Sequence, residues 1–143
     1  MREFFKYVNW NAVFSGLVMF MFVGIPFSLG ITIGGSYILE NMFGIAVAEH
    51  STAYGLITCL LYFTFMVGCG LFSGRASRTA PVLNGFLVGV ITFLFFIFLI
   101  PFRATVKDPS PLWAHYAFAI SLLPAAWLGG YIAFKRFCQP PKI

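Results

Sequence analysis

Few residues in this chain are of types that could carry chemistry, and these candidates lie near the ends of its long apolar runs. The chain has two histidines, His50 and His115, and each stands near the start of an apolar run. Two histidines can ligate a haem or a pigment, and together with Glu49 and Asp108 they could form a metal or acid–base site. No spacing motif for a metal, a nucleophile or a phosphate-binding loop accompanies them. The histidines are therefore candidate cofactor ligands, but we expect them to be solvated and expect no cofactor.

The composition places these residues in a membrane protein. Hydrophobic residues make up 60% of the chain and charged residues 9%, whereas soluble domains carry about 25% charged residues. About 20 apolar residues span the hydrocarbon core of a bilayer, and four runs are long enough, at residues 11–39, 54–74, 82–100 and 112–134. The sequence predicts an all-α polytopic membrane protein, with one transmembrane domain over residues 1–143 and no soluble domain.

The basic residues predict how the four spans are oriented. The turn at residues 75–81 is too short to cross a bilayer, so the spans on either side of it form an antiparallel hairpin. The predicted outer loops are residues 40–53 and 102–111. Lys and Arg favour the cytoplasmic side of a membrane. Seven of the nine basic residues share the side of the turn and of both termini: Arg2, Lys6, Arg75, Arg78, Lys135, Arg136 and Lys142.

This charge distribution predicts two antiparallel hairpins with both termini in the cytoplasm, in the cell (inner) membrane of a prokaryote. Arg75, Arg78, Lys135 and Arg136 then face the lipid headgroups, and these lipids account for the net charge of +5 better than nucleic acid does. We expect no nucleic-acid partner.

Two polar features bear on how the spans work. No Asp, Glu, Lys or Arg lies away from the ends of a span, which argues against a carrier driven by protons or cations. Asn84 stands near the inner end of its span, where we expect it to bind the turn at residues 75–80.

The first run is about 43 Å long as one helix, so with Pro26 near its middle we expect it to tilt or kink and to project past the outer surface.

Small residues four positions apart occur in every span. One helical turn separates the members of such a pair, so both lie on one face and let a neighbouring backbone approach closely. The sequence predicts that these faces are helix contacts within the chain or with another chain. The pairs are Gly30 and Gly34, Gly70 and Gly74, Gly85 and Gly89, Ala125 and Gly129, and Ala126 and Gly130.

These features favour a small non-enzymatic accessory subunit of a larger membrane protein assembly, which acts by helix packing. Its partners would be membrane lipids and either other membrane subunits or further copies of itself. A second hypothesis is a homo-oligomeric channel or small-solute transporter lined by hydroxyl groups and glycine backbone. A third is a haem- or pigment-carrying subunit that uses His50 and His115, and a fourth is a membrane enzyme that uses the outer histidines and acids.

Overall fold

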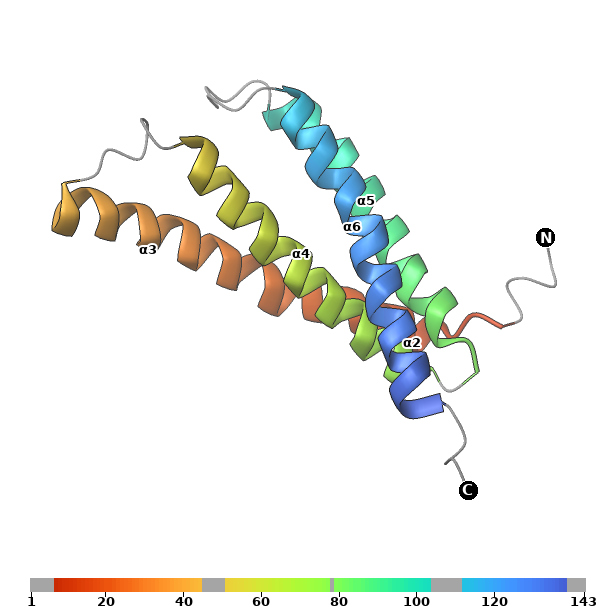
Figure 1. The fold of residues 1–143 in the computed structure, drawn as a ribbon. Helices are drawn as coiled ribbons and strands as arrows, with labels where there is room; N and C mark the ends of the chain where they lie inside the picture. Colours follow the sequence, from red (N-terminus) through yellow and green to blue (C-terminus); the bar gives the residue numbers. More distant parts are fainter. Residues whose placement is uncertain (1–6, 45–50, 78, 104–111, 139–143) are drawn as a thin grey trace.

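The computed structural model describes residues 7–44, 51–77, 79–103 and 112–138, and every element in this part of the chain is helical (Figure 1). In chain order the elements are α2 (Trp10–Met19), the π-helical turn η1 (Phe20–Gly24), α3 (Ile25–Phe43), α4 (Ser51–Ala76), α5 (Pro81–Arg103), α6 (Leu112–Ala133) and the π-helical turn η2 (Phe134–Cys138).

Four of the described helical stretches are long and apolar enough to cross a membrane. They contain the segments Trp10–Phe27, Cys59–Ala76, Pro81–Phe98 and Tyr116–Phe137. At 1.5 Å per residue even the 18-residue segments reach about 27 Å, close to the thickness of the hydrocarbon core. The predictions of an all-helical chain and of four membrane-length helices are confirmed.

The first helix is continuous through α2, η1 and α3, and Pro26 explains its change of geometry. Proline has no N–H, and its ring clashes with the carbonyl group four residues earlier. Just before it the backbone widens into a π turn, in which the Ile25 N–H donates to the Phe20 carbonyl, five residues back. Widening of this kind keeps the remaining backbone groups paired around a proline in a membrane helix.

The second half of this helix leaves the rest of the molecule. The ring of Phe27 packs on Phe65 of α4, with centroids 5.1 Å apart. Beyond this contact α3 diverges from α4 (Figure 1), and the side chains of Tyr37 and Met42 are 66% and 73% exposed. The second half of the first helix therefore lies apart from the other helices beyond Phe27.

Two helices continue past the ends of the predicted apolar runs. The first run was predicted to end at residue 39, but α3 continues to Phe43 and ends before Gly44, whose φ of 65° suits glycine at a helix terminus. The third span was predicted to end at Pro101, but α5 runs through it to Arg103, since a proline in the last turn removes only one backbone hydrogen bond. Helices need not stop where the apolar residues stop. Of the predicted outer loops, residues 45–50 and 104–111 lie outside the described residues.

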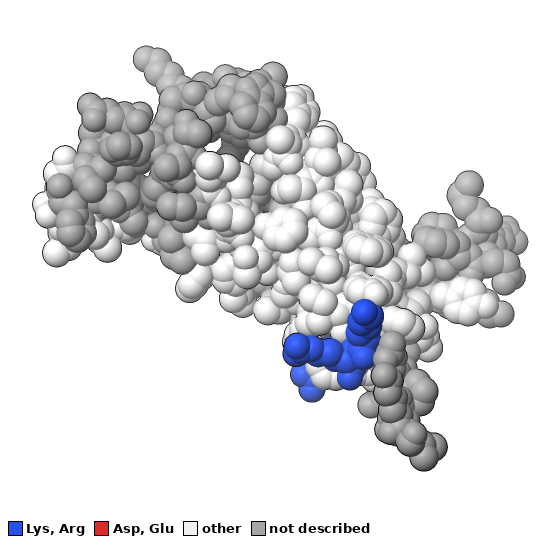
Figure 2. Space-filling model, in the orientation of Figure 1, with Lys and Arg blue, Asp and Glu red and all other residues white. Residues whose placement is uncertain are grey.

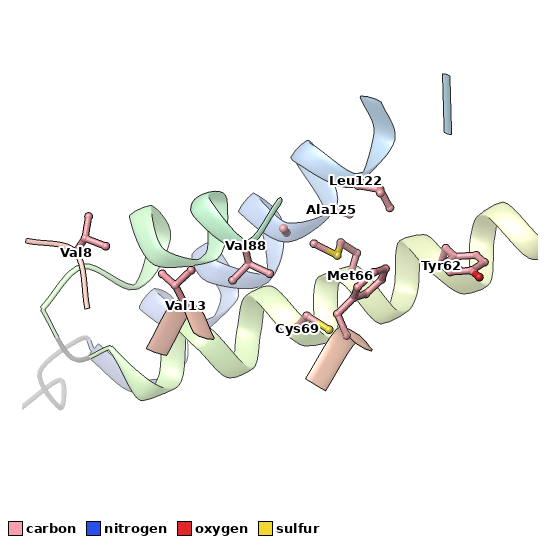
Figure 3. Packing of buried hydrophobic residues seen from close by; sticks show 10 residues of the cluster. Val8, Val13, Tyr62, Met66, Cys69, Val88, Leu122 and Ala125 are labelled. Atoms are coloured by element: carbon pink, nitrogen blue, oxygen red, sulfur yellow. The ribbon is translucent and has the colours of Figure 1, made fainter. Parts of the chain in front are cut away.

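The hydrophobic core lies where α2, α4, α5 and α6 meet. Figure 3 shows its buried side chains, among them Val13 of α2, Met66 of α4, Val88 of α5 and Leu122 of α6. Helix α6 packs along both α4 and α5, which also contact each other, and α2 lies against α4 and α5. The bundle therefore consists of α2 and the last three long helices, without α3.

Four aromatic rings join the helices within this core. Five pairs among Phe20 of η1, Tyr62 of α4, Phe96 of α5 and Phe118 of α6 have ring centroids between 5.2 and 6.5 Å apart. Most of these pairs are edge-to-face, an arrangement that aromatic quadrupoles favour. The side chain of Phe20 is almost fully buried, so the π turn that follows α2 is also a packing point.

A buried amide fastens the start of the first helix to the turn between α4 and α5. The Asn84 side chain is fully buried; it donates to the Ser77 hydroxyl and to the Ala80 carbonyl. Its oxygen accepts a hydrogen bond from the Asn9 N–H at 3.0 Å, and the Asn9 side chain caps α2 through the Ala12 N–H. The prediction that Asn84 binds this turn is confirmed.

We predict that Asn84→Leu destabilises the protein by about 1–2 kcal/mol, because it leaves the Asn9 N–H and the Ser77 hydroxyl without their buried partner. Unfolding in mixed micelles of increasing denaturing-detergent content measures the loss. Asn41→Leu is the control, since within the described residues the exposed Asn41 amide donates to the Tyr37 carbonyl of its own helix and to no other group. An equal loss in both variants would contradict the role of Asn84.

Candidate functional site

Helices α4 and α6 approach each other closely at two glycines. A Cβ atom on Gly70 would collide with the carbonyl group of Ala126, and one on Gly129 would collide with the backbone of Val67 and Leu71. Only hydrogen fits at either position. The two backbones are thus in direct contact, the geometry that small residues permit in membrane helices.

The contact of α5 with α6 has the same character. A Cβ on Gly85 would lie 2.8 Å from the Gly130 Cα, and a Cβ on Gly130 would lie 2.7 Å from the Pro81 carbonyl oxygen. One turn along α5, a Cβ on Gly89 would lie 2.9 Å from the Cβ of Ala126. Helix α6 therefore presents small residues to both neighbours over the same stretch of its length.

Gly74 extends this site toward the turn. A Cβ there would lie 2.7 Å from the Cβ of Ala133 and 3.2 Å from the Gly130 Cα. The structure thus brings together the predicted positions on α4, α5 and α6: Gly70, Gly74, Gly85, Gly89, Ala126 and Gly130, with Gly129 beside them.

The contact of α2 with α4 and α5 was not predicted from the sequence. A Cβ on Gly16 would lie 2.9 Å from the Val88 side chain and 3.0 Å from the Ser73 Cβ. Ala12, one turn earlier on the same face, is also buried. The spacing of Ala12 and Gly16 matches that of the other pairs, so the same pattern could have found this contact.

The pair on α3 differs from all of these. A Cβ on Gly30 or Gly34 would meet nothing within 4 Å in the described part of the chain. Gly30 is exposed and Gly34 is partly exposed. The same four-residue spacing therefore marks a filled contact on α4, α5 and α6 and an open one on α3.

The side chains of the two candidate cofactor ligands lie outside the described part of the structure. His50 lies outside the described residues; His115 lies in α6, but its side chain is outside the described part. Among the described residues, no group of three His, Cys, Asp or Glu side chains could hold a metal ion.

Three of the residues predicted to face lipid headgroups gather at the end of the bundle where α4 terminates. Arg75 is in the last turn of α4, and Lys135 and Arg136 are in η2; all three are exposed and lie close together at one end of the molecule (Figure 2). Arg78 lies outside the described residues.

Comparison with known proteins adds no relative to this geometry. The chain matches no protein-family model, and neither a curated protein nor a solved structure was found to be similar to it.

We predict that Gly70→Ala destabilises the protein by about 1–3 kcal/mol, because the added methyl group forces α4 and α6 apart. The same unfolding assay in mixed micelles measures this change. Gly68→Ala is the matched control on the same helix, since a Cβ on Gly68 meets no described atom within 4 Å. Alanine is the better helix former by up to about 1 kcal/mol, so the control should be neutral or stabilising. Equal stability of the two variants would refute the close contact.

Proposed function

We propose that this chain is a small non-enzymatic accessory subunit of a larger membrane protein assembly, and that it binds its partner through α3. The observation that carries the proposal is the open glycine face of α3. Gly30 and Gly34 lie one turn apart, with no atom of the described residues within 4 Å of a Cβ on either, on a helix whose end diverges from the bundle (Figure 1). Such a face suits close approach by a helix of another subunit.

The contrast with the rest of the chain supports this assignment. The small faces of α4, α5 and α6 pack against one another. The small face of α2 at Gly16 packs against α4 and α5. Exposed aromatic and aliphatic side chains of α3 flank the open face, among them Phe27, Tyr37 and Ile38. Lipid chains can cover these exposed side chains. A helix of another subunit, however, can bring its backbone into direct contact with Gly30 and Gly34, and this adds van der Waals contact that lipid does not provide.

The proposed topology has both termini and the turn at residues 75–81 in the cytoplasm, with the four spans in two antiparallel hairpins. The start of α2 and the turn before α5 are joined by Asn9 and Asn84, and Ala133 near the end of α6 lies against Gly74 near the end of α4. Arg75, Lys135 and Arg136 lie at that same end (Figure 2). The positive-inside tendency then favours a cytoplasmic location for this end, in the inner membrane of a prokaryote.

Native mass spectrometry after extraction from host membranes in mild detergent tests the proposal. We expect the tagged wild-type chain to carry a foreign membrane subunit, and Gly34→Leu to reduce recovery of that subunit roughly tenfold or more, since bulk at a close contact costs about 1–3 kcal/mol. Leucine is the better helix former, so the variant chain itself should stay folded. Gly68→Leu, on the open side of α4, is the control and should retain the subunit.

A wild-type chain recovered as a stable monomer, with thermal stability independent of its concentration, would contradict the subunit role. Recovery as a homo-oligomer alone would also contradict it and would favour a self-assembled channel or transporter. If Gly34→Leu and Gly68→Leu both lost the partner subunit, the assignment of the binding face to α3 would be wrong.

A further inference from the structure

The three cations at the end of the bundle come from two helices that finish side by side. Arg75 is in the last turn of α4, and Lys135 and Arg136 follow α6 in η2. The C-terminus of a helix carries partial negative charge, which favours cations at this position. Figure 2 shows these residues as one basic patch on the surface.

Aromatic rings hold two of these cations in place without neutralising them. The Arg75 guanidinium lies 4.9 Å from the centroid of the Phe137 ring, so it bridges α4 and η2. The Lys135 ammonium lies 5.0 Å from the centroid of the Tyr131 ring. A cation on a ring face is positioned by the ring quadrupole and keeps its charge for a further ligand. In the described parts of the chain, none of the three cations pairs with a carboxylate.

The same rings indicate the depth of the patch. Tyr131 stacks on Trp127 with centroids 5.6 Å apart and planes at 10°, and the Trp127 side chain is 45% exposed. Tyr and Trp concentrate where a membrane meets water. The apolar segment of this helix ends at Phe137, so the cations lie where the hydrocarbon gives way to headgroups, which long basic side chains reach readily.

We propose that Arg75, Lys135 and Arg136 form a binding site for the phosphate of an anionic lipid headgroup, with the stacked Trp127 and Tyr131 beside its acyl chains. Three exposed cations at this depth favour an anionic ligand. An anionic lipid supplies both the phosphate for the cations and the acyl chains for the apolar contact. Each basic residue near an anionic surface contributes roughly fivefold in affinity. The site is remote from the open face of α3 and does not depend on the subunit role.

Native mass spectrometry of the purified chain, titrated with phosphatidylglycerol or with phosphatidylcholine of the same acyl chains, tests this site. We expect the wild-type chain to retain phosphatidylglycerol preferentially, and Lys135→Gln with Arg136→Gln to weaken that binding roughly tenfold or more. Arg103→Gln, at the opposite end of α5, is the control for loss of one positive charge and should bind as the wild type does. Since the side chains of Lys135 and Arg136 are exposed, the melting temperature of the double variant should not change.

A competition arm separates a lipid site from a phosphate site. An excess of inorganic phosphate or of water-soluble glycerophosphate should leave most of the phosphatidylglycerol bound, because neither replaces the contact with the acyl chains. Equal retention of the two lipids, unchanged binding by the double variant, or full displacement by inorganic phosphate would each overturn the proposal.

Discussion

The structure depends on direct backbone contact between α6 and its two neighbours. In lipid there is little hydrophobic drive between helices, so the helices associate through van der Waals packing and hydrogen bonds. Gly70 and Gly129 bring α4 to the backbone of α6, and Gly85 with Gly130 brings α5 to it. Dispersion attraction falls steeply with distance. Because the glycines have no side chain at these points, long stretches of α4 and α5 can pack closely against α6. The aromatic core and the buried Asn84 then lie in the remaining space between the helices.

This arrangement separates the roles of the two halves of the first helix. Helix α2 is held by the Gly16 contact and by the bond between Asn9 and Asn84. The π turn before Pro26 follows, and among the described residues nothing contacts the small face of α3 at Gly30 and Gly34. The small face of α3, where a Cβ on Gly30 or Gly34 meets no atom of the described residues within 4 Å, is the physical basis of the proposed subunit role.

Much of the fold could be predicted from apolar runs, because a run of about 20 apolar residues has few other solutions than a membrane helix. The helix ends could not be predicted, since α3 and α5 continue past the predicted runs, which end at residues 39 and 100. Spacing alone located the small faces on all four spans, but Gly30 and Gly70 have the same pattern and opposite surroundings. Which face is filled depends on the arrangement of the helices in space, as does the bond that joins Asn9 to a residue 75 positions away.

A double-mutant cycle between Gly74 and Ala133 tests the close approach of α4 and α6 most directly. A methyl group on Gly74 would lie 2.7 Å from the Cβ of Ala133, so Gly74→Ala should destabilise the protein, and removing that Cβ should relieve much of the clash. The account predicts that Gly74→Ala with Ala133→Gly is more stable than the sum of the single changes implies, by about 1 kcal/mol, within the range measured for residues in contact. Strictly additive losses would contradict the contact.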